Sequence, residues 1–193
     1  IMINVSSLYN IHKKGSFGDY ENKNDKDLIT IKEIKNIFMF QIVKYRNSTE
    51  NTSNIKIDGI NFSDVLKSTS NSSTRIIWMG PNNWYIYSIK DISQELKQIK
   101  ETEYAITNLS QSRSIIEIEG HMVYEVLKKG TPLEVDKLKA DYCANTVYNG
   151  ITITLDVVSN NPNIIRIFGL RSFGESLYHS LTDSCLEFGY KAI

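Results

Sequence analysis

The chain has 193 residues, of which 41% are hydrophobic, so it can bury a core without disulfides or metals. Lysine plus arginine and aspartate plus glutamate each number 22, so the formal net charge is zero. A chain without a basic field does not attract phosphate backbones, which argues against nucleic acid as a partner. No run reaches the ~18 apolar residues of a membrane span, and the start of the chain lacks a secretory signal pattern. We therefore expect a cytoplasmic protein with no membrane partner.

The first part of the chain is polar and lacks hydrophobic periodicity. We expect residues 1–27 to form a loosely ordered N-terminal arm. Periodic sequence begins near Leu28, and residues 38–43 (FMFQIV) have the length and the β-branched and aromatic content of a buried strand. A short helix is predicted over 61–67.

Two aromatic and β-branched runs, 75–79 and 84–87, flank the segment 80–83, which reads GPNN. Proline and asparagine between such runs are typical of a hairpin turn, so two paired antiparallel strands are predicted. A capped amphipathic helix is predicted from Asp91, because Gln94 follows at the spacing of a capping box.

A similar series of elements follows in the second half. The predicted elements are strands over 104–109, 116–119, 151–157 and 164–168, a helix over 123–127 that stops at Gly130, and a last helix that ends at Gly189. Ser172 is the predicted N-cap of the last helix, with Phe173, Leu177, Leu181 and Phe188 on its buried face.

This order of elements predicts an α+β fold, with helices packed on mainly antiparallel sheets. We expect a single domain over 28–193, made of two ferredoxin-like halves at about 28–110 and 111–193. The duplication is inferred from element order, because the halves share no evident repeat of residues.

The sequence offers little that would carry chemistry. It contains no glycine-rich phosphate loop, and its three histidines are far apart without metal-ligand spacing. Cys143 and Cys185 lack the pairing of a redox dithiol and are interpreted as reduced core residues. Ser110 lacks the flanking glycines of a nucleophile turn. We therefore expect no catalytic residue and no metal site.

Two residues are candidates for contact with a partner or ligand. Trp84 lies beside the predicted hairpin turn and is interpreted as either a core residue or an interface anchor. Trp78 is the better candidate for the core. Arg113 follows a predicted strand, where its planar guanidinium could hold backbone carbonyls or a partner's carboxylate, the alternative being an ordinary surface arginine.

Four segments together resemble a known family. Residues 75–84 (RIIWMGPNNW) resemble the W-L-G-P-D-E-W signature that gamma subunits of heterotetrameric sarcosine oxidase share with the folate-binding T-protein of the glycine cleavage system. Residues 108–113 (NLSQSR) are similar to the D-L-S-x-S-R run of the gamma subunits, and 126–133 (VLKKGTPL) to their V-L-x-K-G-C-P-L-D. Arg171 opens the last helix of that family and is a third candidate contact residue.

The resemblance implies a fold like that of the folate-binding domain of T-protein, and a non-catalytic gamma subunit. Its partners would be the larger alpha and beta subunits and the small delta subunit. The complex would oxidise sarcosine to glycine and pass the one-carbon unit to tetrahydrofolate. FAD, FMN, NAD and tetrahydrofolate would be bound by the other subunits, and we expect no cofactor bound by this chain.

The alternative is a free-standing folate-binding or one-carbon transfer protein of the T-protein type, although T-proteins carry a further C-terminal domain. A pterin needs a recessed carboxylate to accept from its N–H groups. Glu117, Glu119 and Asp156 fall on the polar side of their alternating strands and are expected to be solvated. We therefore expect the chain alone to bind tetrahydrofolate weakly.

Overall fold

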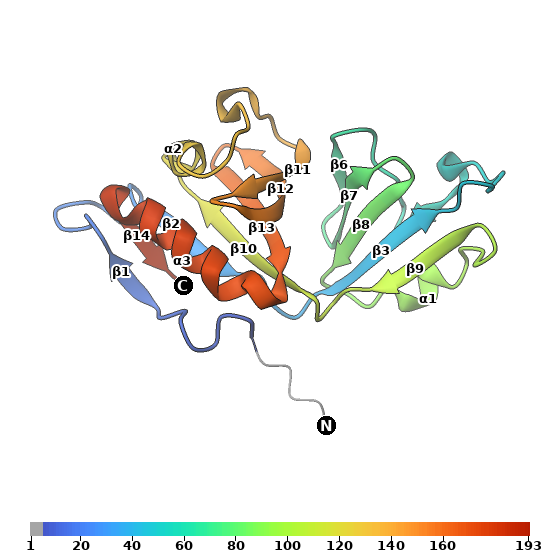
Figure 1. The fold of residues 1–193 in the computed structure, drawn as a ribbon, viewed down its shortest axis with the longest axis horizontal. Helices are drawn as coiled ribbons and strands as arrows, with labels where there is room; N and C mark the ends of the chain where they lie inside the picture. Colours follow the sequence, from blue (N-terminus) through green and yellow to red (C-terminus); the bar gives the residue numbers. More distant parts are fainter. Residues whose placement is uncertain (1–5) are drawn as a thin grey trace. The chain divides into compact units, whose positions relative to one another are not determined.

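The structure is a computed structural model that describes residues 6–193 (Figure 1). The chain divides into two compact units. Unit 1 comprises Ile1–Lys35 and Ser112–Ile193, and unit 2 comprises Asn36–Gln111. The expectation about a signal pattern at the very start of the chain falls on 1–5, outside the described residues.

Unit 1 is built on a seven-stranded sheet. Its strands, in sheet order, are β1 (Gly15–Phe17), β14 (Tyr190–Ala192), β2 (Ile29–Glu33), β10 (Arg113–Glu119), β13 (Asn163–Leu170), β12 (Ile151–Asn160) and β11 (Cys143–Tyr148). Neighbours are antiparallel except β14 and β2, which run parallel.

One face of this sheet carries the core of unit 1. Helix α3 (Gly174–Cys185) lies across the strands in Figure 1, and α2 (Val123–Lys128) also packs into the core. Short 3₁₀ turns η2 (Val135–Lys137), η3 (Arg171–Phe173) and η4 (Leu186–Phe188) complete the unit. Leu177 and Leu181 of α3 are fully buried against strand residues such as Ile116 and Ile165. The apolar period of α3 and the alternation along the strands therefore meet in one core.

The start of α3 differs from the prediction. The chain enters the helix through η3, so Ser172 lies inside that turn and makes no capping hydrogen bond. Phe173 precedes the helix and is 49% exposed, whereas it was expected on the buried face. The tighter 3₁₀ winding turns this side chain away from the face that Leu177 continues.

The N-terminal segment is also not the expected arm, as far as it is described. Gly15–Phe17 pairs with β14, and Leu8 is fully buried in the core of unit 1. The ring of His12 contacts the hydroxyl of Tyr178 on α3 at 2.9 Å. The predicted halves, 28–110 and 111–193, differ from the two units as well, because β2 pairs with β10 and β14 and so belongs to the C-terminal part.

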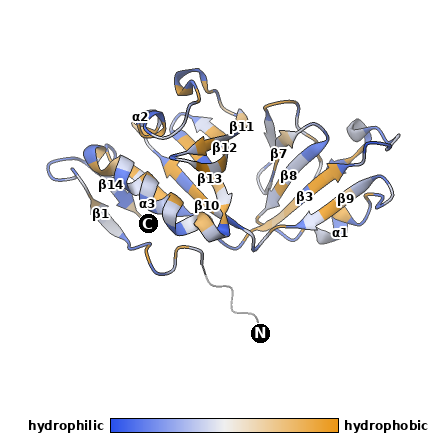
Figure 2. Cartoon of the chain, in the orientation of Figure 1, coloured by the Kyte–Doolittle hydropathy of each residue, from blue (hydrophilic) through white to orange (hydrophobic). Residues whose placement is uncertain are grey.

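Unit 2 contains a five-stranded sheet with strand order β6 (Ser68–Ser70), β7 (Thr74–Gly80), β8 (Asn83–Ser88), β3 (Phe38–Lys44) and β9 (Tyr104–Asn108). It also contains the two-stranded hairpin of β4 (Lys56–Ile57) and β5 (Ile60–Asn61), helix α1 (Ser93–Leu96) and the 3₁₀ turn η1 (Thr52–Asn54). Figure 2 shows apolar residues along β3, where Phe40 and Ile42 are buried beside Ile86 of β8.

The predicted hairpin in unit 2 is confirmed. Strands β7 and β8 pair antiparallel, with Trp78 opposite Trp84, and Asn82 in the turn has a φ of 57°. The predicted helix over 61–67 is wrong, because β5 occupies its start and a turn closed by Lys67 N donating to Asp64 O occupies its end. The turn Asp58–Gly59 between β4 and β5 has φ values of 50° and 78°, which suit a tight two-residue hairpin loop. The α+β class with mainly antiparallel sheets is confirmed.

Candidate functional site

Trp84, the first predicted contact residue, lies in the core of unit 2. Its side chain is 6% exposed, its Nε1 donates to the carbonyl of Ser63 at 3.0 Å, and its ring centroid is 4.6 Å from that of Phe62. Trp78, expected to be the better core residue, is only partly buried on the same face. In this conformation Trp84 supports the core, and its predicted role as an anchor for a partner stays a prediction.

Arg113 and Arg171 are brought together at one end of the unit 1 sheet. Arg113 begins β10 opposite Leu170, and the backbone N–H of Arg171 donates to the carbonyl of Ser112 at 3.0 Å. Both arginines are partly exposed, and Nη1 of Arg113 lies 3.2 Å from the carbonyl of Ser112. The two residues therefore share one surface region, which sequence distance alone did not indicate.

The chain passes between the units at Lys35–Asn36 and again at Gln111–Ser112, and the second of these points lies within the segment 108–113. On the unit 2 side, Ser110 N donates to Asn108 Oδ1 at 2.9 Å, and Met39 N donates to Ser110 Oγ at 2.9 Å. Asn108 stands where the resembled motif has aspartate, and its Oδ1 accepts this hydrogen bond as a carboxylate oxygen could. The contacts within each unit explain this motif as a structural one.

Four charged residues form a row across the sheet of unit 1. Lys32 on β2, Glu117 on β10, Arg166 on β13 and Asp156 on β12 are successive cross-strand neighbours. Lys32 Nζ is 2.7 Å from Glu117 Oε1, and Arg166 Nε donates to Glu117 Oε2 at 2.7 Å. The charges alternate in sign along the row, so each member has an opposite charge beside it.

The row corrects the expectation that Glu117 and Asp156 are solvated. Glu117 is 3% exposed and Asp156 is fully buried. Each oxygen of Glu117 is engaged by a cation, Oε1 by Lys32 and Oε2 by Arg166.

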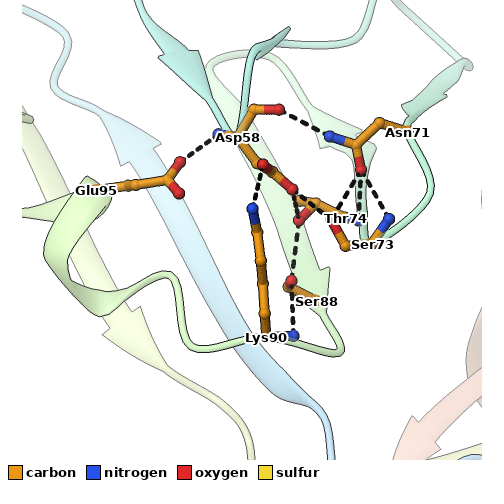
Figure 3. Close-up of polar contacts among 7 residues, drawn as sticks. All are labelled: Asp58, Asn71, Ser73, Thr74, Ser88, Lys90 and Glu95. Carbon is orange, nitrogen blue, oxygen red and sulfur yellow. Dashed lines mark hydrogen bonds and ion pairs between the residues drawn. The ribbon is translucent and has the colours of Figure 1, made fainter.

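A second polar cluster, in unit 2, centres on the carboxylate of Asp58 (Figure 3). Lys90 donates to Oδ1, while Ser73 Oγ and Thr74 Oγ1 donate to Oδ2 at 2.6 and 2.7 Å. Thr74 Oγ1 also lies 2.9 Å from Ser88 Oγ. These hydrogen bonds, led by that from Lys90, hold the pKa of Asp58 well below its usual value.

The backbone of Asp58 is held as firmly as its side chain. Its N–H donates to Glu95 Oε2, and its carbonyl accepts from Asn71 Nδ2 at 2.7 Å (Figure 3). Asp58 is thus the point at which the β4–β5 hairpin joins the β7–β8 end of the larger sheet. We interpret this cluster as structural, because the hydrogen bonds to Asp58 all hold the turn of the β4–β5 hairpin in place.

Neither cysteine is placed for chemistry. The thiols of Cys143 and Cys185 are fully buried, and burial raises the pKa of Cys185 to about 12. A thiol with this pKa is almost entirely protonated near neutral pH, so it is a poor nucleophile.

A polar surface pocket of about 500 Å³ lies in unit 1, at the turn between β12 and β13. It is lined mainly by polar residues, among them Asp25, Glu119, His121 and Asn163. Among the described histidines, cysteines and carboxylates, no group of three or more could hold a metal ion. Within residues 6–193, no helix is both long and apolar enough to span a membrane.

No protein-family model and no curated protein matches this chain. Among solved structures, it is similar to a chain of heterotetrameric sarcosine oxidase from Corynebacterium sp. U-96, in complex with pyrrole 2-carboxylate. That similarity covers 86% of this chain and 87% of the other, with a TM-score of 0.75 and 20% identity. The chain is also similar to aminomethyltransferase T of the glycine cleavage system from Bartonella henselae, over 81% of its length, with a TM-score of 0.62 and 10% identity.

The chain spans 46% of the length of that aminomethyltransferase. At these identities the likeness concerns the fold, and the predicted relationship to the sarcosine oxidase and T-protein folds is confirmed.

Proposed function

We propose that this chain is the non-catalytic gamma-type subunit of a heterotetrameric sarcosine oxidase in the cytoplasm. The observation that carries the proposal is the fold match to a chain of that enzyme, which covers nearly the same share of both chains. The segments 75–84, 108–113 and 126–133 support it independently, because they are read from sequence and not from fold.

In this proposal the other subunits, alpha, beta and delta, bind FAD, FMN, NAD and tetrahydrofolate. Two features of this chain support a scaffolding role. The carboxylate of Glu117 is occupied by Lys32 and Arg166, and the thiol of Cys185 is buried with a pKa of about 12. The chain alone is proposed to bind tetrahydrofolate weakly.

The alternative, a T-protein-type folate or one-carbon transfer protein, is favoured by the second structural match. The two proposals differ in what the isolated chain binds. Anaerobic calorimetry with tetrahydrofolate distinguishes them: a dissociation constant in the low micromolar range, about −8 kcal/mol, would favour the alternative.

Co-expression tests the main proposal. The chain, tagged, is expressed with the alpha, beta and delta subunits from its own source, and the purified material is examined for flavin absorbance and sarcosine-dependent oxygen uptake. The proposal predicts a flavin-containing, active complex, and a colourless, inactive chain when it is expressed alone. Flavin bound stoichiometrically by the isolated chain would overturn the non-catalytic assignment.

A further inference from the structure

Two large apolar side chains are exposed at the corner where β13 passes into α3. Leu170, which directly precedes the turn η3, is 45% exposed, and Phe173, the last residue of that turn, is 49% exposed. Phe173 is four residues before Leu177, so a helix that began earlier would have buried it with that residue. The conformation of the chain instead presents both side chains to solvent. We call Arg113, Leu170, Arg171 and Phe173 the β13–α3 corner.

The backbone behind this corner is closely packed. A Cβ on Gly174 would lie 3.0 Å from Ser114 Oγ and 3.2 Å from Ser7 Cβ, and one on Gly169 would lie 2.8 Å from Leu177 Cδ2. These approaches leave the backbone little room to shift. The exposed side chains therefore project from a preorganised base, which lowers the entropy cost of binding a partner.

Two arginines are neighbours of these apolar residues, one in sequence and one in the sheet. Arg171 lies between them in sequence, and Arg113 lies opposite Leu170 in the pairing of β10 with β13. The acidic residue nearest to Phe173 in sequence is Glu175, in the first turn of α3. Arg171 and Arg113 are thus both adjacent to Leu170, the first in sequence and the second across the strand pair.

We infer that the β13–α3 corner docks this chain onto a larger subunit of its complex, at a surface that is apolar in the centre and bordered by carboxylates. This inference rests on the proposed function. Exposed aromatic and arginine side chains on a rigid base are typical of the residues that dominate binding energy at protein interfaces. A planar guanidinium pairs with a carboxylate through two parallel hydrogen bonds, which sets the charge of the complementary surface.

A second copy of this chain is a less favourable binding partner for the β13–α3 corner than a larger subunit. A two-fold contact through the corner would bring the same patch of both copies together. Arg171 would then lie near Arg171 of the other copy, and like charges at an interface cost free energy. Charge complementarity therefore favours a different, acidic partner.

Serine variants of the corner test the inference in the co-expressed complex. Leu170→Ser combined with Phe173→Ser is expected to weaken binding to the larger subunits by roughly tenfold or more. Ile89→Ser is the matched control, because Ile89 is an apolar side chain of unit 2 that is 70% exposed. Its assembly is expected to equal that of the wild type. Charge reversal of Arg171 to Glu is expected to weaken assembly in the same direction.

A photo-crosslinker provides a second measurement that does not depend on the stability of the serine variants. p-Benzoylphenylalanine at position 173 is expected to crosslink to the alpha or beta subunit, whereas the same residue at position 9, where Tyr9 is 75% exposed, is not.

The docking surface would be overturned if the wild-type chain assembles, position 173 gives no crosslink, and the serine variant binds as tightly as the wild type. The proposed function would then remain intact. Crosslinking between two copies of the chain would also overturn it, in favour of self-association. Failure of the wild-type chain to assemble at all would overturn the proposed function, and the docking surface with it.

Discussion

Glu117 on β10 accepts a 2.7 Å hydrogen bond from Nε of Arg166, its direct cross-strand neighbour on β13. Because Glu117 is buried and also pairs with Lys32, its loss leaves two cations without their carboxylate. We expect Glu117→Gln to lower the free energy of unfolding by roughly 3 kcal/mol, the lower end of the range for buried pairs broken on one side, because Lys32 and Arg166 are partly exposed. Urea denaturation of the isolated chain measures this.

Glu134→Gln is the control for that variant. Glu134 pairs with Lys137, and the two side chains are 68% and 76% exposed. Such a pair is expected to contribute no more than about 0.5 kcal/mol. Equal losses for the two variants would show that the charged row contributes no more than an ordinary surface ion pair.

Asp58 gives a prediction about pH. Its pKa is lowered in the folded chain, chiefly by Lys90, so its contribution to stability is present above the unfolded pKa of about 3.9 and is lost as pH falls through the folded value. Asn at this position keeps the side-chain shape and tolerates the positive φ. We expect the difference in melting temperature between wild type and Asp58→Asn to be large at pH 6 and to shrink as pH falls below about 4. A difference independent of pH would refute the ionic contribution.

Substitutions of Trp84 are predicted to lower the stability of the folded chain, because this side chain lies in the core of unit 2. Trp84→Phe keeps one aromatic ring but loses the pyrrole ring and its hydrogen bond to Ser63, so it is expected to cost more than the roughly 1 kcal/mol of the hydrogen bond alone. Trp84→Ala is expected to cost about 3–5 kcal/mol because it leaves a cavity beside Phe62. Urea denaturation of both variants measures this, and an unchanged stability of Trp84→Ala would contradict the core position.

The cysteines are predicted to be inert in the folded chain. Cys143 and Cys185 are fully buried, so a thiol reagent at pH 8 is expected to label neither until the chain unfolds. The labelling kinetics with and without denaturant provide the measurement. Rapid labelling of the native chain would contradict the burial of these thiols.

Short sequence patterns predicted those strands and turns whose pairing partners lie close by in the sequence. The β7–β8 hairpin follows from GPNN between two apolar runs, and the alternation over 151–157 falls within β12. The place of β2 could not be predicted in the same way, because its partner β14 lies at the far end of the chain. Long-range parallel pairing leaves no signal in a short window of sequence.

The candidate site was predicted less well, for a different reason. Alternation separates the two faces of a strand, but it does not say whether the polar face meets water. Glu117 and Asp156 were therefore placed in solvent, whereas both are buried. Arg166, in the apolar run IIRIF, was the available signal, because a lone arginine in a buried strand indicates a carboxylate partner on its neighbour.

Native mass spectrometry of the complex purified through this chain tests the central claim most directly. The account predicts that the chain, co-expressed with the alpha, beta and delta subunits from its own source, is found as one copy in a heterotetramer that carries flavin and oxidises sarcosine. Removal of this chain should leave the flavin on the remaining subunits. An active, flavin-containing enzyme of normal mass that never incorporates the chain would contradict the account.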